Sequence, residues 1–324
     1  MTTVFVTGAN GFLGATLVRI LLETGYRVRG LVRAGANDLL LQNLPLERVT
    51  GDLLQPESYR HALSGCEGLF HVAAAYTHDP QAIPSMEAIN HRGTRLVLTA
   101  ALEAGVPRLL HTSTIGTIGL PSDGSPATED IPFNVDHPTA YVRSKLAGER
   151  EAEALAREGA HIVIVHPTAM LGPGDWRPSN SGRFVLDVLH GRTPPYPPGG
   201  INWCPVQDIA RGMILALERG QSGRHYILGH RRGNLLYSDF LGLLGEALGH
   251  PLVHSRTPGS IATRARAWLR RLRRPSRPDR ASGSAPARLT ADPSRAIREL
   301  GMPQSDLLAA ARAEIAWYRQ HGYL

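Results

Sequence analysis

The stretch Thr7-Gly8-Ala9-Asn10-Gly11-Phe12-Leu13-Gly14 joins a strand pattern to a helix pattern through three glycines. Residues 2–7 are apolar or β-branched, which is typical of a buried strand, and residues 12–23 carry apolar side chains at helical spacing. Glycines at such a turn let the backbone approach a pyrophosphate, and the N-terminus of the helix attracts its charge. The stretch therefore predicts a dinucleotide site formed by Gly8, Asn10, Gly11, Phe12, Leu13 and Gly14.

Strand and helix patterns continue to alternate along the first half of the chain. Helical patterns include residues 90–104 and 139–157. Further strands are expected at residues 28–32, 48–51, 68–73, 108–111 and 161–166. Such alternation is typical of βαβ units. It predicts an α/β fold, a doubly wound parallel sheet of the Rossmann type, over residues 1–170.

The sequence changes character after about residue 170. Residues 172–183 and 191–200 are rich in proline and glycine, and residues 273–287 have the composition of an exposed loop. Helical patterns with little strand between them occur at residues 184–190, 208–218, 238–248 and 307–320. We expect residues 171–324 to form mainly a smaller C-terminal substrate-binding lobe, with some segments returning to the Rossmann domain.

The composition indicates an aliphatic core, since 42% of the 324 residues are hydrophobic and only 6% are aromatic. An aliphatic core suits a parallel sheet covered by helices. No apolar run approaches the roughly 20 residues that cross a bilayer, and the first residues lack a signal-peptide layout. Cys66 and Cys204 are too few for a disulfide framework. These features predict a cytoplasmic protein.

The net charge of +7 is concentrated in one segment. Residues 256–280 contain nine arginines and one acid, so the rest of the chain carries a charge of −1. No nucleic-acid partner is therefore expected for the fold as a whole. Within the segment, residues 261–274 have a basic helical pattern with a thin apolar stripe. The pattern fits a solvated surface helix, a helix that lies on an anionic membrane or covers a lipophilic substrate, or a helix that attracts an anionic substrate or nucleic acid.

Tyr141 and Lys145 form a Y-x-x-x-K pattern within the helical stretch 139–157. The i, i+4 spacing places both side chains on one face of the helix. A free tyrosine has a pKa of about 10, which is too high for a base at neutral pH, and a neighbouring ammonium favours the phenolate. The pattern is common by chance, but after a dinucleotide turn it predicts an acid–base pair.

The glycine spacing with Phe12 resembles the T-G-x-x-G-F-x-G motif of the extended short-chain dehydrogenases/reductases, also called the NAD-dependent epimerase/dehydratase family. Residues 51–53 (GDL), 72–75, 90–94 (N-x-x-G-T) and 166–173 resemble further motifs of that family, and the likeness covers nearly the whole chain. The resemblance implies that Asn90 supports the active-site backbone. It also implies cofactor contacts from Asp52, Leu53, Ala73, Ala74, Ala75, Asn90, Thr112, Tyr141, Lys145, Pro167, Thr168 and Met170.

A hydroxyl donor to the substrate is expected where the fifth strand ends. Residues 111–119 carry several candidates. The family places its catalytic serine or threonine at the position of Thr114, with Ser113 as the nearby alternative. The resemblance therefore implies Thr114, Tyr141 and Lys145 as the catalytic residues, while Ser113 or Thr112 braces the end of the strand.

The coenzyme is predicted from the end of the second strand. Enzymes that use NAD place an acid there to bind the ribose 2′-hydroxyl. This chain has Val32 followed by Arg33, and a guanidinium can bind a 2′-phosphate in a bidentate way. We therefore expect NADP(H) rather than NAD(H), the alternative being that Arg33 is an ordinary exposed residue.

Within the family, the chain is most similar to dihydroflavonol reductase-like and hopanoid-associated sugar epimerase-like proteins. Ile115 and Gly116 follow Thr114, where nucleotide-sugar dehydratases usually carry an Asp-Glu pair. This difference favours an oxidoreductase acting on a carbonyl/alcohol pair. An epimerase or dehydratase that retains its cofactor is the alternative, and a non-catalytic NADP(H) sensor is a further one. Family resemblance also implies a homodimer.

A substrate pocket is expected between the sheet and the smaller lobe. Its predicted walls, for a small molecule that could be lipophilic, are Tyr76, Ser113, Trp176, Asn180, Arg183, Tyr196 and Trp203. His166 occupies a position where the family usually has arginine, and we interpret it as structural. The histidines in strand patterns lack the spacing of metal ligands, so no metal site is predicted.

Overall fold

The computed structural model describes residues 2–192, 199–252 and 288–324. Its main sheet has seven parallel strands in the order β3-β2-β1-β4-β5-β6-β9. These strands are β1 (Thr3–Thr7), β2 (Arg27–Val32), β3 (Glu47–Thr50), β4 (Gly68–His71), β5 (Leu109–Thr112), β6 (Ile162–Pro167) and β9 (His225–Leu228). The six strands expected from the first half are all present. The doubly wound α/β fold is therefore confirmed.

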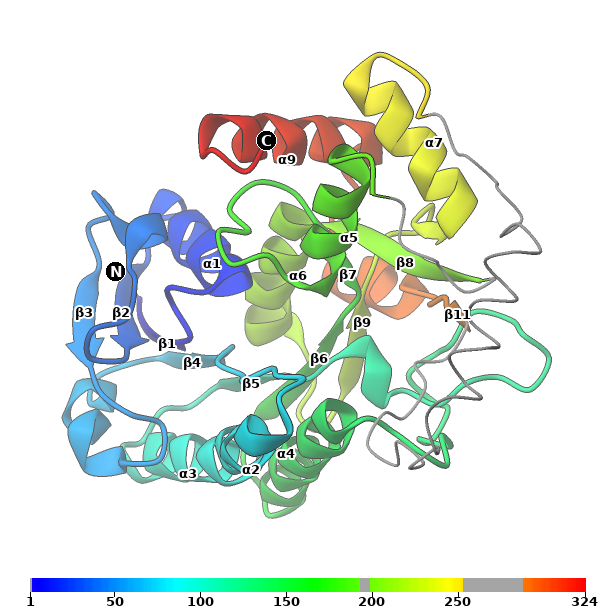
Figure 1. The fold of residues 1–324 in the computed structure, drawn as a ribbon. Helices are drawn as coiled ribbons and strands as arrows, with labels where there is room; N and C mark the ends of the chain where they lie inside the picture. The colour runs from blue at the N-terminus through cyan, green and yellow to red at the C-terminus, as the bar shows by residue number, and fades with distance from the viewer. Residues whose placement is uncertain (1, 193–198, 253–287) are drawn as a thin grey trace.

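Helices cover both faces of this sheet (Figure 1). One face carries α1 (Phe12–Glu23) and α6 (Val206–Arg219). The other carries α2 (Ile83–Glu87), α3 (Thr94–Glu103) and α4 (Ala140–Arg157). Successive strand residues point to opposite faces, so both layers draw on the same strands for their cores.

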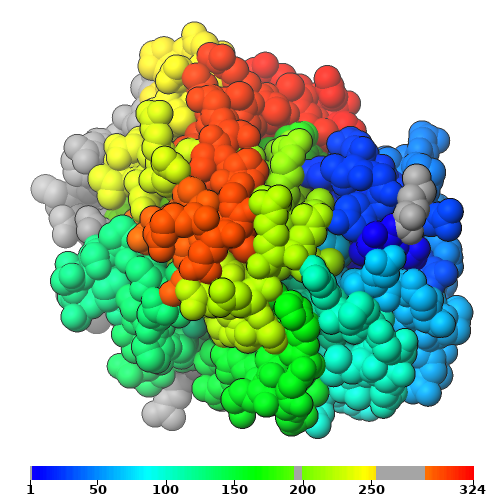
Figure 2. Space-filling view, turned by 180° about the vertical axis from the view of Figure 1, so that it is seen from behind, coloured from blue at the N-terminus to red at the C-terminus, as the bar shows by residue number. Residues whose placement is uncertain are grey.

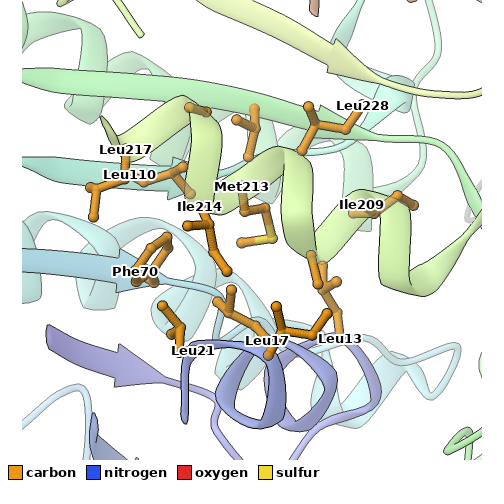
Figure 3. Close-up of a cluster of buried hydrophobic side chains, with 14 of the residues drawn as sticks. Leu13, Leu17, Leu21, Phe70, Leu110, Ile209, Met213, Ile214, Leu217 and Leu228 are labelled. Carbon is orange, nitrogen blue, oxygen red and sulfur yellow. The ribbon is translucent and has the colours of Figure 1, made fainter. Parts of the chain in front are cut away.

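The helix α6 packs against α1 through apolar side chains at helical spacing. Figure 3 shows Leu17 and Leu21 of α1 facing Met213 and Ile214 of α6. All four side chains are buried, and burying one such side chain stabilises the fold by about 1.5–3 kcal/mol. Residues from the second half of the chain therefore complete the core of the main sheet.

The C-terminal part forms a smaller lobe around a second sheet (Figure 1). In this sheet β8 (Gly200–Pro205) pairs with β7 (Ala169–Leu171), β10 (Asn234–Leu236) and β11 (Arg288–Leu289). The lobe also contains α5 (Asn180–Leu189), α7 (Tyr237–Leu248) and α9 (Leu307–Gln320). The expectation of little strand here was wrong, because three of these four strands are too short to show an alternating pattern.

Seen from behind, α6 and the C-terminal segment that contains the π-helix Ala296–Leu300 lie side by side (Figure 2). The guanidinium of Arg219 in α6 donates a hydrogen bond to the carbonyl of Leu300, at 2.9 Å. The predicted pocket residue Tyr196 and the segments 261–274 and 273–287 lie outside the described residues. Within the described part, no helix has both the length and the apolar character that a membrane crossing requires.

Candidate active site

The turn between β1 and α1 requires two of its glycines for steric reasons. Gly8 has a φ of +68°, and a Cβ there would lie 2.8 Å from the backbone of Ala73. A Cβ on Gly14 would lie 2.0 Å from the carbonyl oxygen of Gly8. The helix α1 begins after Gly11 without a side-chain cap and without an acid in its first turn. Its N–H groups are thus available to an anion, as the sequence predicts.

The smaller lobe contacts this turn directly. The indole Nε1 of Trp176 donates to the carbonyl of Asn10, at 3.2 Å. The amide of Asn10 donates to the carbonyl of Asn37, at 2.9 Å, and so ties the turn to the segment after β2. Phe12 lies near Gly174. The residues predicted for cofactor and substrate binding therefore meet at Asn10 and Trp176.

The end of β2 presents a cation to solvent. Arg33 is exposed directly after the strand, and its side chain has no hydrogen-bond or ion-pair partner among the described residues. The nearby carboxylate of Asp38 is paired with Arg48, at 2.6 Å. Asp52 follows β3, and its Oδ1 accepts from the backbone N–H of Leu54, at 2.8 Å. The G-D-L turn is thus shaped by its own aspartate.

A single buried amide braces the segment after β4. The Oδ1 of Asn90 accepts from the N–H of Ala75, at 2.7 Å, and its Nδ2 donates to the carbonyl of Ala75, at 2.8 Å. The same Nδ2 donates to Ser144 in α4, at 2.9 Å. Asn90 therefore supports the backbone at Ala75 and the helix α4 that carries Tyr141.

The helix α4 lies very close to the π-helix Ala88–Gly93 that carries Asn90. A Cβ on Gly148 would lie 2.2 Å from the carbonyl oxygen of Asn90. At its N-terminus, α4 is capped by Thr139, whose hydroxyl accepts from the N–H of Val142, at 3.2 Å. The close approach at Gly148 sets how tightly α4 packs on the π-helix, and the cap at Thr139 sets where α4 begins.

Tyr141 meets two of the predicted site residues. Its side chain has a hydrogen bond with Thr114, and its ring packs edge-on against Tyr76 with a centroid separation of 4.8 Å. Burial, with a smaller contribution from Tyr76, raises the pKa of Tyr141 to about 12, and the bond to Thr114 opposes this rise. The hydroxyl of Tyr141 is therefore protonated at neutral pH.

Lys145 lies one turn further along α4, and its side chain is buried. The ammonium Nζ donates to the carbonyl of Thr112, at 2.6 Å. Burial lowers the pKa of Lys145 to about 8, and the carboxylate of Glu149 opposes this shift. From the sequence we expect the lysine to favour the phenolate of Tyr141, whereas burial dominates in the structure and favours the phenol.

The structure separates the roles of the two hydroxyl candidates. Thr114 contacts Tyr141 and accepts from the N–H of Gly116, at 3.3 Å. Ser113 is buried, donates to the carboxylate of Glu149 and lies 3.0 Å from the hydroxyl of Thr117. The hydroxyl of Ser113 therefore faces a buried carboxylate, and a substrate contact from Ser113 stays a prediction.

Two of the predicted pocket residues meet above Tyr141. The amide of Asn180, at the start of α5, donates to the hydroxyl of Tyr76, at 2.7 Å. Tyr76 remains 43% exposed, so its ring offers an apolar surface to a ligand. Arg183 is exposed on the next turn of α5, where its Nε donates to the carbonyl of Pro178, at 3.1 Å.

Trp203 does not belong to this pocket. Its ring stacks on Phe240 with a centroid separation of 3.6 Å and an interplanar angle of 5°, and it is 2% exposed. The prediction of Trp203 as a pocket wall was therefore wrong, since the residue packs the core of the smaller lobe. The sequence could not distinguish these roles, because both call for a large aromatic side chain.

The end of β6 contributes the remaining predicted cofactor residues. Pro167 pairs with Leu228 of β9. Thr168 donates its N–H to the carbonyl of Leu228, at 3.1 Å, and Met170 is half-buried in β7. These residues lie at the same carboxyl edge of the sheet as Thr112 and Thr114 of the β5 end.

Two buried histidine networks were missed by the sequence analysis. His71 lies between the hydroxyls of Thr7, at 2.8 Å, and Thr94, at 2.9 Å, and burial lowers its pKa to about 3. Thr7 also accepts from two backbone N–H groups after β4, so this network links the end of β1 to the start of α3. The second network joins His166 to His225 at 2.9 Å.

Comparisons with known proteins identify the family of the chain. Residues 4–229 match the model of the NAD dependent epimerase/dehydratase family. The chain is 38% identical to a dihydroflavonol 4-reductase-like protein of Synechocystis, over 99% of this chain and 95% of that protein. It is 33% identical to sterol demethylase protein B of Methylococcus capsulatus, over 99% of this chain and 100% of the relative. The chain therefore belongs to the NAD-dependent epimerase/dehydratase family, the extended short-chain dehydrogenases/reductases.

Further relatives include both reductases and dehydratases. Cinnamoyl-CoA reductase 1 of Oryza sativa is 33% identical, over 70% of this chain and 71% of the relative. Among solved structures, a dTDP-glucose 4,6-dehydratase from Streptomyces venezuelae with NAD bound has a TM-score of 0.78 and 26% identity, covering 98% of this chain and 97% of the other. A nicotinamide cofactor is thus a property of the family.

Two buried carboxyl groups form hydrogen bonds with the backbone around Trp176. Glu314 of α9 accepts from the N–H of Gly172, at 2.8 Å, and Asp175 accepts from Ser179. Burial raises the pKa of Glu314 to about 8 and raises that of Asp175 as well. Glu314 therefore keeps its proton at neutral pH, although an unfolded chain would release it.

This difference predicts a pH-dependent stability. Between its ordinary pKa of 4.5 and about 8, Glu314 is protonated only in the folded chain, so the free energy of unfolding falls as the pH rises through this range. Each unit of difference corresponds to about 1.4 kcal/mol. We expect Glu314→Gln to flatten the decline, as measured by denaturant unfolding between pH 5 and pH 8. Parallel curves for the two proteins would contradict this assignment.

Proposed function

We propose that the chain is an NADP(H)-dependent oxidoreductase that transfers a hydride between nicotinamide and a carbonyl/alcohol substrate, with Tyr141 as general acid/base. The supporting observation is the path of residues 73–76. Ala73 lies against Gly8 of the glycine turn, and Tyr76 packs on Tyr141. One short segment thus connects the anion-binding turn to the acid–base residue.

The residues around the turn fit a dinucleotide. The close approach of Gly8 to Ala73 and the uncapped start of α1 leave backbone N–H groups for a pyrophosphate. Asp52 and the segment after β4 would line the adenosine half, and residues 167–170 the nicotinamide half. When bound, the cofactor supplies or accepts the hydride.

The side chains supply the proton, the hydrogen bond and the charge that the reaction also requires. In the direction of reduction, the protonated Tyr141 donates its proton to the carbonyl oxygen of the substrate, and Thr114 donates a hydrogen bond to the same oxygen. The phenolate left behind is stabilised by the buried ammonium of Lys145 on the same face of α4. Such proton transfer contributes about 10²–10⁴ to the rate.

A lipophilic carbonyl compound is the proposed substrate class. The exposed ring of Tyr76 packs on Tyr141, and the half-buried indole of Trp176 lies at the glycine turn. Relatives are named for dihydroflavonol, cinnamoyl-CoA and sterol chemistry. Ile115 and Gly116 follow Thr114, so the acid–base pair of nucleotide-sugar dehydratases is absent from this position.

The test of the reaction class is stoichiometric. We expect NADPH absorbance at 340 nm to fall in step with product when the protein is given dihydroflavonols, hydroxycinnamoyl thioesters or sterol ketones. An epimerase or dehydratase would convert a nucleotide sugar with no net change in absorbance, and that outcome would replace the reductase proposal. A non-catalytic sensor would bind NADPH and turn over no substrate.

Tyr141→Phe tests the acid–base residue. Because the ring remains and only the hydroxyl is lost, we expect kcat to fall by about 10²–10⁴ while the Kd for NADPH stays unchanged. Tyr26→Phe is the matched control, since that hydroxyl contacts Glu218 on the surface, at 2.6 Å. Steady-state kinetics and a cofactor titration provide the measurements. Turnover that survives in Tyr141→Phe would assign the acid–base role elsewhere.

Arg33→Ala tests the choice of coenzyme. Charge-assisted hydrogen bonds are worth about 1.5–3 kcal/mol, so we expect the KM for NADPH to rise roughly 10- to 100-fold while that for NADH is unchanged. Arg27→Ala is the control, because Arg27 is exposed at the opposite end of the same strand. Equal kcat/KM values for the two coenzymes in the unmodified protein would rule out NADP(H) specificity.

A further inference from the structure

The segment between β7 and α5, residues 172–180, touches the candidate site at two points, and we call it the bridging segment. The indole of Trp176 donates to the carbonyl of Asn10 in the glycine turn, at 3.2 Å. The amide of Asn180 donates to the hydroxyl of Tyr76, at 2.7 Å. Both contacts depend on where the bridging segment lies, so the groups that hold it act on the site from a distance.

Local hydrogen bonds give the bridging segment its shape. Both carboxyl oxygens of Asp175 accept from the N–H of Ser179, at 3.0 and 2.9 Å, and Oδ2 accepts from the hydroxyl of the same serine, at 2.7 Å. The hydroxyl of Ser179 accepts from the N–H of Gly182 and so caps α5. A Cβ on Gly182 would lie 2.1 Å from Asp175 Oδ2. These bonds stay within residues 175–182, so they do not place the segment against the glycine turn.

Two backbone groups of the bridging segment are bound from far along the chain, by α9 and the residues that follow it. The carboxyl group of Glu314 accepts from the N–H of Gly172, at 2.8 Å, across 142 positions. The hydroxyl of Tyr323 donates to the carbonyl of Trp176, across 147 positions. Figure 1 shows α9 above the loop that leads into α5. These two bonds connect the segment to the C-terminal helix at its first residue and at its tryptophan.

The rings around Tyr323 hold its hydroxyl in place. Its ring packs against Tyr318 and Trp317, with centroid separations of 5.3 and 5.6 Å. Tyr318 is fully buried, and its own hydroxyl donates a long hydrogen bond to Asp175, at 3.5 Å. The position of Tyr323 is thus set by ring packing as well as by its hydrogen bond. Removing the hydroxyl alone leaves the packing intact and tests the bond to Trp176.

We infer that Tyr323 and Glu314 are positioning residues, which hold the backbone of the bridging segment so that Trp176 meets the glycine turn. Loss of either bond frees the segment to move away from Asn10, and the turn then offers its N–H groups in a less fixed arrangement. The effect on coenzyme binding rests on the proposed function. Tyr141 and Thr114 bond each other directly, so proton transfer should change less than coenzyme affinity.

The positioning role is tested without any ligand, by hydrogen exchange of the full chain followed by mass spectrometry. In Tyr323→Phe we expect faster amide exchange in the bridging segment and in the glycine turn, residues 8–14, with unchanged exchange in α3. Unchanged exchange in residues 8–14 would overturn the inference. This result is independent of coenzyme and substrate, so it decides the positioning role even if the chain does not bind NADP(H).

The effect on coenzyme binding is tested by titration with NADPH. Since one hydrogen bond is lost, we expect Tyr323→Phe to raise the Kd for NADPH about 2- to 10-fold and to leave kcat at saturating NADPH within about twofold. A loss of folded protein alone would lower kcat and leave the Kd unchanged, and that outcome would refute the inference. Failure of the unmodified protein to bind NADPH would count against the proposed function, with hydrogen exchange still deciding the positioning role.

A double-mutant cycle tests whether Tyr323 acts through Trp176. Trp176→Phe removes the indole N–H that bonds Asn10 and should itself raise the Kd for NADPH. Adding Tyr323→Phe to this variant should then raise the Kd little further, because the contact that Tyr323 supports is already lost. Fully additive effects of the two substitutions would show that Tyr323 does not act through Trp176 and would overturn the inference.

A pair of variants at Glu314 completes the experiment. Glu314→Gln keeps an oxygen that accepts from Gly172 and should leave the Kd for NADPH near that of the unmodified protein, whereas Glu314→Leu loses the acceptor and should raise it. Equal Kd values in the two variants would refute the role of Glu314. Tyr26→Phe is the matched control, because it loses a hydroxyl next to the first residue of β2, at the opposite edge of the sheet from the glycine turn.

Discussion

The side-chain amide of Asn90 is the interaction on which the geometry of the site depends. It bonds both backbone groups of Ala75 and the hydroxyl of Ser144, so one buried group fixes the segment after β4 and the helix α4 at once. The absence of a side chain at Gly148 lets α4 approach closely enough for this to happen. A buried amide is costly unless its hydrogen bonds are made, and here both of its atoms are bonded.

The candidate site is therefore held together by side chains that bond the backbone more than by direct contact between the candidate catalytic groups. Lys145 bonds the carbonyl of Thr112, and His166 bonds the carbonyl of Thr114. Asn90 bonds the backbone of Ala75. The chain at the ends of β4 and β5 is thus held by side chains from neighbouring elements. In this arrangement the hydroxyls of Tyr141 and Thr114 lie next to each other.

The sequence was sufficient for the features that local patterns determine. The six strands of the first half, the glycine turn and the helix of Tyr141 each depend on residues within one short window. The role of Thr114 against Ser113 required the structure, because it depends on the position of Glu149, a side chain 36 residues from Ser113. The pairing of His166 with His225 was equally out of reach, since it depends on the neighbouring strand β9, which the sequence analysis did not predict. Whether Trp203 packs in a core or lines a pocket could likewise not be predicted from the sequence.

The smaller lobe contacts the Rossmann domain at two places that a dinucleotide would span. Trp176 bonds the glycine turn at Asn10, and Asn180 bonds Tyr76, which packs on Tyr141. Both residues belong to one stretch, 176–180, at the start of α5. A ligand that stabilises this stretch from the lobe side also stabilises the turn, and thermodynamic linkage makes the effect reciprocal. If a bound coenzyme raises the affinity for the substrate by some factor, a bound substrate raises the affinity for the coenzyme by the same factor.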